Sequence, residues 1–472
     1  MRLIGCLLFV GLQLGIVKGQ SLSRKLEVAF RNFESDPSLH YGIASLTVLN
    51  AQTGEVVFAK NEETGLATAS TLKTITSATA FYLLGPEYRY STKLYYTGNL
   101  SADGTLKGDI IISGSGDPSL GSDRFEQSRE GVLLARWQTA IQRAGIKQIE
   151  GGIIADDCLF DGQSAPGGWT WNNLGNYYGA GVSALNWREN QFAVNFTPGS
   201  KTGDLTRIRE VIPETKYLQL VNETRTGKLG SGDQVNGYGG PYASRLYLRG
   251  SYGKDLRKKI CFSLPDAAYD AAYRLKQWLD SAGIHTMGEP ATTHNRLLAG
   301  IDLPVQRNLL DEYKSPELAD LIYWFQQKSI NLYGEALLKT MAVLDSAGHD
   351  PEDEARVVRD FWVKKAGIPE AALDIIDGSG LSPQNRVTTL AMARILASVK
   401  TEPWFNSYYK SFPEYNGMKM KSGTTNGVLG YSGYQISKDG TPLVFCLLVN
   451  NYHSGTQIMR QKMFRLLDTL KL

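Results

Sequence analysis

Cysteine and histidine are scarce in this sequence, which limits the kinds of site that it can form. The 472 residues include four cysteines and five histidines. Beyond residue 19 the cysteines are Cys158, Cys261 and Cys446, an odd number at wide spacings that fits neither a dense disulfide framework nor a zinc site. We predict that these three are small core residues. Because the histidines are scattered without metal-ligand spacing, we expect no metal, and no motif implies a cofactor.

An excess of charge of either sign is also missing. Lys and Arg total 50 and Asp and Glu total 47, so the formal net charge is +3. Because a domain that binds nucleic acid usually carries a marked basic excess, we predict no nucleic-acid partner. Hydrophobic residues make up 42% of the chain, which is enough for large cores. The length exceeds what one core usually organises, so two or three domains are expected.

Long apolar runs are absent except at the amino terminus. There, Met1 and Arg2 precede an apolar run over residues 3–17, and residues 17–19 suit signal-peptidase cleavage. This pattern predicts a signal peptide over residues 1–19 and export of the mature chain. The alternative is a membrane anchor, but the run is shorter than the roughly 20 apolar residues of a spanning helix. No integral membrane segment is expected after cleavage, and the sequence does not define the oligomeric state.

β-rich and helical runs follow one another along the rest of the chain. Residues 41–50 and 55–60 are predicted to form a hairpin, and residues 67–84 a helix that ends at a Gly-Pro pair. Between residues 88 and 305 the pattern changes to short Gly-rich strands, with helices near 130–143 and 266–281, which indicates an insertion. Helical patterns return at 315–344, 352–366 and 388–400. Strands at 419–424, 429–437 and 443–450 and a helix at 456–470 complete an α+β order.

A serine and a lysine lie three residues apart in the first predicted helix. The sequence Ser-Thr-Leu-Lys at 70–73 places the hydroxyl of Ser70 and the amine of Lys73 on one helical face. A serine hydroxyl is a weak nucleophile, and a lysine can take its proton when burial or nearby cations lower the lysine pKa. The same spacing recurs at 251–254 and 407–410, so it indicates little by itself.

Two further motifs lie late in the chain. Ser329 and Asn331 flank Ile330 at a break in helical sequence, where a loop could direct both polar side chains into a cleft. Lys421, Ser422, Gly423 and Thr424 open a predicted edge strand. Its glycine lets a substrate backbone approach closely, and its lysine and hydroxyls would bind a terminal carboxylate. A Lys-Thr-Gly copy at 201–203 precedes the second motif and follows a Pro-Gly turn, so we interpret it as unrelated.

Taken in this order, the three motifs resemble the Ser-x-x-Lys, Ser-Asp-Asn and Lys-Thr-Gly signature of β-lactamases and penicillin-binding proteins, with Ile330 and Ser422 as conservative substitutions. Segments 113–118, 154–157, 168–186 and 377–382 further resemble the D-alanyl-D-alanine carboxypeptidase/endopeptidase family, the class C low-molecular-mass penicillin-binding proteins. The resemblance implies a β-lactamase/transpeptidase-like domain, an antiparallel sheet flanked by helices, with a large two-part insertion between the first and second motifs. The domains expected are a peptidase domain at 20–87 and 306–472, inserted domain II at 88–172 and 265–305, and inserted domain III at 173–264.

The resemblance also implies the reaction. A serine-type D-Ala-D-Ala carboxypeptidase and DD-endopeptidase of this family acts on peptidoglycan stem peptides and is acylated by β-lactam antibiotics. Ser70 would attack the carbonyl between two D-alanines, with Lys73 as the base. Ser329 and Lys421 would pass the proton to the leaving amine, and Asn331 would hold the peptide. The exported enzyme would be periplasmic or associated with the cell wall.

Substrate-binding residues are implied in the same way. Lys421 and Thr424 would bind the terminal carboxylate on a strand that also contains Ser422 and Gly423. Asp156 matches a family aspartate that meets the amino group of the substrate's diamino-acid side chain; the alternative is a solvated turn residue. One position departs from the family, because Pro383 follows the segment 377–382 where an arginine is common. The preference for a side-chain carboxylate is therefore open.

Two other functions fit parts of the pattern. A serine β-lactamase shares the three motifs, but it needs a base that activates water for deacylation. The sequence contains no convincing Glu-bearing loop of that kind, and the long insertion does not suit a compact lactamase. A catalytically silent cell-wall-binding homologue is the second alternative, and the intact motifs speak against it.

Overall fold

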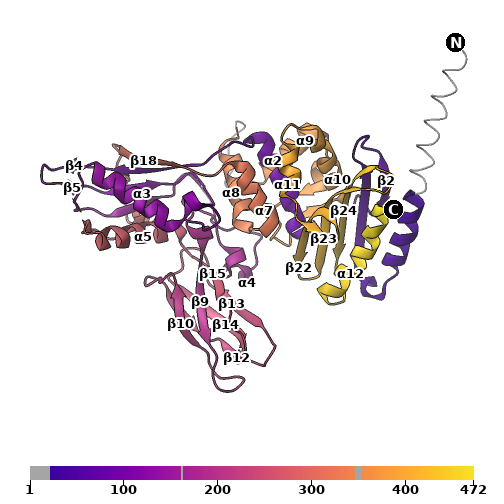
Figure 1. The fold of residues 1–472 in the computed structure, drawn as a ribbon, viewed down its shortest axis with the longest axis horizontal. Coiled ribbons are helices and arrows are strands. Elements are labelled where there is room, and N and C mark those ends of the chain that lie inside the picture. Colours follow the sequence, from indigo (N-terminus) through magenta and orange to yellow (C-terminus); the bar gives the residue numbers. More distant parts are fainter. Residues whose placement is uncertain (1–21, 161–162, 346–352) are drawn as a thin grey trace, which may run out of the picture. The chain divides into compact units, whose positions relative to one another are not determined.

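Two compact units make up the chain. The computed structural model describes residues 22–160, 163–345 and 353–472 (Figure 1). Among these residues, the first unit contains 22–86, 322–329 and 355–472, and the second contains 87–160, 163–321, 330–345 and 353–354. The predicted signal peptide over residues 1–19 lies outside the described residues. None of the helices in the described part of the chain is long and apolar enough to cross a bilayer.

A six-stranded antiparallel sheet forms the centre of the first unit. In spatial order its strands are β2 (Val56–Lys60), β1 (Ile43–Asn50), β24 (Pro442–Asn450), β23 (Val428–Ile436), β22 (Met418–Thr425) and β21 (Glu414–Tyr415). The predicted hairpin and the three predicted carboxyl-terminal strands are therefore confirmed. β1 pairs with β24 along its whole length, so the two ends of the sequence complete one sheet.

Helices cover both faces of this sheet because successive side chains of a strand point to opposite faces. On one face, Leu46 and Phe445 share a core with the helix at residues 22–34 and with α12 (Thr456–Leu467). On the other face, Ser45 hydrogen-bonds Thr389 at the start of α10 (Thr389–Ser398). Figure 1 shows α2 (Lys73–Leu83), α9 (Arg356–Ala366) and α11 (Phe405–Ser411) on the same side as α10.

The three cysteines do not share one environment. Cys446 is buried in β24, as predicted, whereas Cys158 is exposed and Cys261 is half-buried. The prediction that all three are core residues is therefore wrong for two of them. Cys158 lies in a turn directly after a strand, where the backbone has left the core.

One core of the second unit lies between two small sheets and two helices. The five-stranded sheet contains β17 (Ala291–Thr292), β8 (Ile153–Asp156), β6 (Ile110–Ser113), β3 (Ser91–Tyr96) and β18 (Asn308–Lys314). The four-stranded sheet contains β16 (His285–Thr286), β7 (Gln148–Ile149), β5 (Thr105–Lys107) and β4 (Asn99–Leu100). Helix α3 (Glu130–Arg143) buries Trp137 and Ile141, and helix α5 (Ala267–Ser281) buries Leu275 and Leu279. In each helix the two residues are four positions apart and so lie on one face. Both predicted helices of the insertion are confirmed.

A second core belongs to residues 191–263, which we call the β lobe. One sheet contains β10 (Arg207–Ile212), β9 (Gln191–Thr197) and β15 (Ile260–Ser263). The other contains β11 (Gln219–Asn222), β14 (Arg245–Gly253), β12 (Arg225–Gly227) and β13 (Asp233–Tyr238). Phe192, Leu246 and Phe262 are among the residues that fill the space between them. The assignment of residues 173–264 as a separate domain stays a prediction.

The division differs from the predicted domain boundary at residue 306. Strand β18 pairs with β3 from Asn308 to Lys314, so residues 306–321 belong to the same unit as the insertion. Helix α8 (Asn331–Val343) belongs to that unit too. Pairing between β3 and β18 links residues more than two hundred positions apart in the sequence, and no local pattern indicates it.

Candidate active site

Ser70 lies in a tight turn that precedes a helix. It belongs to a 3₁₀ turn, η2 (Ala69–Leu72), and the regular helix α2 begins only at Lys73. The helix predicted over residues 67–84 thus starts later than expected. Ala69 has a φ of +43°, a left-handed conformation that costs a residue other than glycine about 1–3 kcal/mol. Because the surrounding packing must offset this strain, the backbone at Ser70 is held in one position.

Lys73 is buried and directed at Ser70. Its side chain is 0% exposed, and its Nζ donates to Ser70 Oγ at 3.0 Å and to the carbonyl oxygen of Ser379 at 2.6 Å. The backbone carbonyl of Lys73 accepts from Nε2 of Gln326, on α7 (Leu318–Lys328). An amine at hydrogen-bonding distance from a hydroxyl is the arrangement that proton transfer from Ser70 requires.

The segment 377–385 holds the carbonyl group that contacts Lys73. Its Asp377 carboxylate is buried and accepts from the backbone N–H groups of Gly380 and Ser382, at 2.7 and 2.6 Å. Thr76 of α2 donates to the carbonyl oxygen of Gly378 at 2.7 Å. The Asp-Gly-Ser-Gly sequence thus positions Ser379 against the lysine. The segment carries part of the family resemblance, but no local pattern in it predicts a contact with Lys73.

A second hydroxyl–lysine pair is formed by Ser329 and Lys421. Ser329 has a φ of +56° between α7 and α8, which is the predicted break in helical sequence. Nζ of Lys421 donates to Ser329 Oγ at 3.0 Å. Lys421 is 1% exposed, and its pKa is held well below the usual lysine value by burial first and then by the charge of Lys73.

Strand β22 brings the third motif against η2. A Cβ on Gly423 would lie 2.5 Å from the carbonyl oxygen of Thr68 and 2.9 Å from the backbone nitrogen of Ser70, so only glycine fits there. β21 pairs with β22 at Met418 and Lys419. Among the described residues no further strand pairs on that side, so the strand from Lys421 to Thr425 has an open edge. An extended peptide could pair with such an edge beside Ser70.

Four of the five predicted catalytic residues therefore meet in the first unit. Lys73 lies close enough to Lys421 for its charge to lower the pKa of Lys421, and each lysine contacts one serine hydroxyl. Ser422 is half-buried and Thr424 is exposed on the same strand. Two other copies of these sequence patterns lie outside this site. Ser251, of the Ser-x-x-Lys pattern at 251–254, lies in strand β14, and Lys201, of the Lys-Thr-Gly copy, lies in the loop between β9 and β10.

Asn331, the fifth residue, is the first residue of α8 and belongs to the second unit. Its side chain is 9% exposed, and Nδ2 donates to the carbonyl oxygen of Tyr178 at 2.7 Å. Tyr178 lies in η4 (Tyr177–Gly179) of the same unit. The predicted part of Asn331 in holding the peptide stays a prediction.

Asp156 is buried and already paired. Its Oδ2 accepts from Nη1 of Arg307 at 2.6 Å, and Oδ1 accepts from Thr293 Oγ1 at 3.2 Å. Burial raises the pKa of this carboxyl, but hydrogen bonds from Cys158 and Arg307 outweigh it and hold the pKa below the usual value. The alternative of a solvated turn residue is wrong, because Asp156 is 5% exposed. Its predicted contact with a substrate amine stays a prediction.

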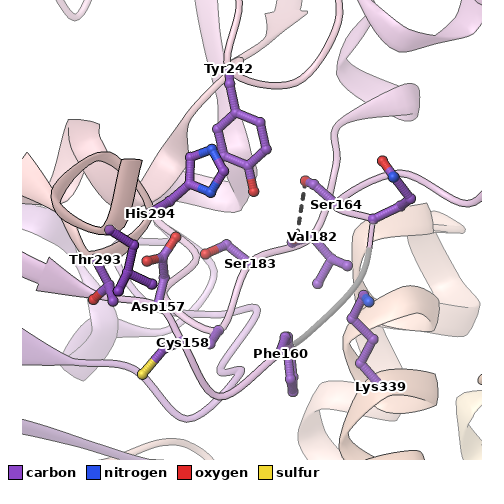
Figure 2. Close-up of a pocket in the computed structure, with 13 residues that line it drawn as sticks. Asp157, Cys158, Phe160, Ser164, Val182, Ser183, Tyr242, Thr293, His294 and Lys339 are labelled. Carbon is purple, nitrogen blue, oxygen red and sulfur yellow. Dashed lines mark hydrogen bonds between the residues drawn. The ribbon is translucent and has the colours of Figure 1, made fainter. Parts of the chain in front are cut away.

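The neighbouring carboxylate, Asp157, lines a cavity of about 200 Å³ in the second unit (Figure 2). Figure 2 shows it below the rings of Tyr242 and His294, which stack with their centroids 4.4 Å apart. Burial first, and then the charge of Asp266, raise the pKa of Asp157 to about 6. Ser164 and Ser183 add hydroxyls to the lining, so the cavity is polar on several sides.

Pro383, the position that departs from the family, is exposed. The guanidinium of Arg386 donates to its carbonyl oxygen, and Nη1 also donates to the carbonyl oxygen of Asn385 at 2.9 Å. A cation therefore lies at this loop although residue 383 is a proline.

An antiparallel sheet between helices, with a Ser–Lys pair before one helix and a lysine on an edge strand, defines the penicillin-binding class of serine hydrolases. The chain belongs to the D-Ala-D-Ala carboxypeptidase 3 (S13) family, whose sequence profile matches residues 26–415. It is thus a serine-type D-Ala-D-Ala carboxypeptidase, a hydrolase.

Two curated relatives extend over most of the chain. The D-alanyl-D-alanine carboxypeptidase of Actinomadura sp. (strain R39) is 25% identical over 450 residues, which are 89% of this chain and 80% of that protein. The D-alanyl-D-alanine carboxypeptidase DacB of Haemophilus influenzae is 21% identical over 434 residues, which are 86% of this chain and 85% of that protein.

Solved structures show the same fold. The crystal structure of penicillin-binding protein 4 from Haemophilus influenzae superposes with a TM-score of 0.77 at 21% identity and covers 92% of this chain and 97% of that one. A second structure of that protein, in complex with a β-lactam, superposes with a TM-score of 0.72 at 20% identity, with the same coverage. The predicted β-lactamase/transpeptidase-like fold with an insertion is confirmed.

Proposed function

We propose that this carboxypeptidase works through an acyl-enzyme on Ser70. Ser70 Oγ attacks the carbonyl carbon between two D-alanines while Lys73 Nζ takes the hydroxyl proton. The 3.0 Å contact between these two atoms is the observation that carries the proposal. The proton then passes to the leaving amine, D-alanine departs, and a water molecule later hydrolyses the ester to free Ser70.

The pair of Ser329 and Lys421 is proposed to relay the proton to the leaving amine. Burial lowers the pKa of Lys421, which makes its ammonium group a better proton donor, and Ser329 lies 3.0 Å from its amine. In its protonated form Lys421 also attracts the terminal carboxylate of the substrate, together with the exposed hydroxyl of Thr424. Asn331 is proposed to hold the peptide.

The backbone N–H groups of Ser70 and Thr424 are proposed to bind the oxyanion of the tetrahedral intermediate. The first residues of a helix leave their N–H groups without intrahelical partners, and the N–H groups of an open strand edge are free in the same way. Close packing of Gly423 on η2 brings the two segments together. Loss of one donor of this type raises the barrier by about 2.7–4 kcal/mol.

The substrates are proposed to be peptidoglycan stem peptides, and the same site is proposed to split cross-bridges as a DD-endopeptidase. A cross-bridge has the same acyl part as the terminal D-Ala-D-Ala and differs in the amine that leaves. β-Lactams would acylate Ser70 in place of the peptide. With the apolar run at residues 3–17, this substrate fits a protein exported to the periplasm or the cell wall.

The test uses purified protein and peptidoglycan fragments followed by mass spectrometry. We expect monomers to lose D-alanine, cross-linked dimers to be split, and both reactions to vanish in Ser70→Ala. Ser407→Ala is the matched control, because Ser407 has the same spacing to a lysine and lies on a helix. Activity that survives in Ser70→Ala would refute the assignment.

A chromogenic cephalosporin separates this activity from that of a β-lactamase. The proposal predicts a stoichiometric burst of product followed by slow turnover, because the acyl-enzyme persists. Rapid continuous hydrolysis would instead favour a β-lactamase. Fluorescent penicillin that fails to label Ser70 would favour a catalytically silent homologue.

A further inference from the structure

Three loops meet at one end of the β lobe. They connect β9 to β10 (residues 198–206), β12 to β13 (residues 228–232) and β14 to β15 (residues 254–259). Lys254 Nζ donates to the carbonyl oxygen of Ser200 at 2.6 Å, which joins the first and third loops. Asp255 accepts from the backbone N–H of Gly230 at 2.9 Å, which joins the second and third. We call these three segments the loop end; they adjoin β10 and β12, which Figure 1 labels.

The loop end carries a strong positive charge in a chain that is nearly neutral. It contains six cations, all of them exposed, and two carboxylates. The cations are Lys201, Lys228, Lys254, Arg257, Lys258 and Lys259. Both carboxylates accept hydrogen bonds within the loops. Asp204 accepts from the hydroxyl of Ser200 and the backbone N–H of Lys201, and Asp255 accepts from the backbone N–H of Gly230. The six cations and two carboxylates give the loop end a net charge of +4, and Lys258 also lies 3.7 Å from the Asp233 carboxylate at the start of β13.

Two large apolar side chains stand among these cations. Leu229 is 74% exposed and Leu205 is 52% exposed, although the β lobe has a core that could hold leucines. The backbone N–H of Gly203 donates to the carbonyl oxygen of Thr226 at 2.9 Å, so the loop that carries Leu205 is held to β12, the strand that precedes Leu229. Exposed leucines surrounded by lysines have no partner in a soluble polyanion, whereas a bilayer offers acyl chains below its phosphates.

We propose that the loop end binds the surface of an anionic lipid bilayer. The lysines and Arg257 lie at the level of the lipid phosphates, and Leu229 and Leu205 enter the boundary between headgroups and acyl chains. Each cation near an anionic surface strengthens binding by a factor of about five. Contact of this kind would hold an exported enzyme at a membrane without a spanning helix.

The first experiment measures partition onto sucrose-loaded vesicles by sedimentation. The protein is residues 20–472, which contain every element that the structure describes and lack the apolar run at 3–17 that could itself bind lipid. We expect binding to vesicles of phosphatidylglycerol and phosphatidylcholine, weak binding to phosphatidylcholine alone, and steep loss of binding as salt rises. Equal binding to both vesicles, or to neither, would overturn the proposal.

Two variants test the residues. Lys201→Gln, Lys228→Gln and Lys259→Gln combined should weaken binding to the mixed vesicles by about a hundredfold. Leu229→Ser should weaken it by about tenfold, because a leucine that no longer enters the bilayer forfeits most of its transfer free energy. Circular dichroism and labelling by fluorescent penicillin should stay unchanged in both variants, since Ser70 belongs to the first unit.

Matched controls use exposed residues elsewhere. Lys107→Gln, Lys147→Gln and Lys410→Gln remove the same charge, and Leu298→Ser removes a leucine that is 77% exposed. Both controls should bind within about twofold of the parent protein. If the lysine control weakens binding as much as the loop-end variant, the effect is one of net charge and the proposal fails. If polyphosphate binds as tightly as the vesicles and Leu229→Ser changes nothing, the loop end is a polyanion site and the lipid proposal is wrong.

Discussion

Gly423 lies so close to Ser70 that a Cβ on residue 423 would be 2.9 Å from the backbone nitrogen of residue 70. Three backbone atoms of the segment 68–71 lie within 2.9 Å of that same point. Neither partner can give way easily, because η2 is followed by a buried helix and β22 is paired with β23. The short distance between Ser70 and β22 is therefore possible only because residue 423 has no side chain.

Gly423→Ala tests this spacing. We expect the extra methyl to push β22 away from η2, to destabilise the protein by about 1–3 kcal/mol, and to slow acylation by fluorescent penicillin at least about tenfold. Stopped-flow labelling and urea unfolding measure the two effects. Gly131→Ala is the matched control, since a Cβ there meets nothing within 4 Å and Gly131 lies in helix α3. Acylation at the parent rate in Gly423→Ala would contradict the proposed geometry.

Lys421 should make stability depend on pH. Its pKa in the folded protein lies well below the value of about 10.4 in an unfolded chain. Between those two values the unfolded chain holds a proton that the native state lacks, so the free energy of unfolding rises with pH. Lys421→Met removes this dependence. Relative to the parent, we expect its unfolding free energy to be most favourable below the folded pKa of Lys421. This advantage falls by about 1.4 kcal/mol for each pH unit between the folded pKa and about 10.

Urea unfolding at a series of pH values checks the Lys421 prediction. Lys419→Met is the control, because Lys419 lies two residues earlier on β22 and is half-buried. The control should follow the parent's pH dependence. Lys421→Met should also lose acylation, because Ser329 then has no amine partner. A parallel pH dependence in Lys421→Met and the parent would show that Lys421 is charged in the folded protein.

Asp156 and Asp157 are adjacent in sequence but should respond differently to substitution by Asn. Asp156→Asn leaves Arg307 without its carboxylate at 2.6 Å, so we expect a loss of about 2 kcal/mol or more in unfolding free energy. Because the pKa of Asp156 is lowered, its contribution is present above about pH 4 and fades as pH falls through the folded value. Asp157→Asn removes a carboxyl whose pKa is raised to about 6, so it should stabilise the protein above that pH.

Substrates with a free and an acetylated side-chain amine separate structure from recognition. If Asp156 contacts that amine, kcat/KM of Asp156→Asn falls for the free-amine substrate and not for the acetylated one. If the carboxylate only holds Arg307, both substrates are affected alike. A selective loss in Asp157→Asn would instead assign the amine to the cavity of Figure 2.

Arg386 is expected to supply the positive charge that the family usually places at residue 383. Its guanidinium already contacts the carbonyl oxygen of Pro383. Arg386→Ala should raise KM for a stem peptide with a free side-chain carboxylate. The increase should correspond to about 1 kcal/mol, as for a partly exposed ion pair. KM for the amidated peptide should stay unchanged. Arg394→Ala, an exposed arginine on α10, is the control. Equal KM values for the two peptides in the parent protein would contradict the prediction.

Local patterns were sufficient for much of the fold. The helix predicted at residues 130–143 agrees with α3, and the three late strands agree with β22, β23 and β24, because their apolar spacing reflects burial on one or both faces. The left-handed Ala69 could not be predicted, since alanine normally favours a helix and the residues that Ala69 packs against, Gly380 and Val428 of β23, lie far away in the sequence.

Long-range partners account for what the sequence could not predict of the site. The motifs indicated Ser70 and Lys73, but the carbonyl of Ser379 that holds Lys73 lies 306 residues away. Likewise, Arg307 pairs with Asp156 from 151 residues further along the chain. Such pairs depend on how sheets and loops assemble, and neither residue carries a local signal of its partner.

The late start of α2 places Ser70 just ahead of the helix instead of within it. Peptide dipoles aligned along residues 73–83 leave a partial positive charge at the amino end of α2, which acts within about one turn. In the proposed acyl transfer, negative charge develops on the substrate carbonyl oxygen at that end. A nucleophile in mid-helix would lack this field, so the strained turn at Ala69 gives the hydroxyl an electrostatic position that a regular helix could not provide.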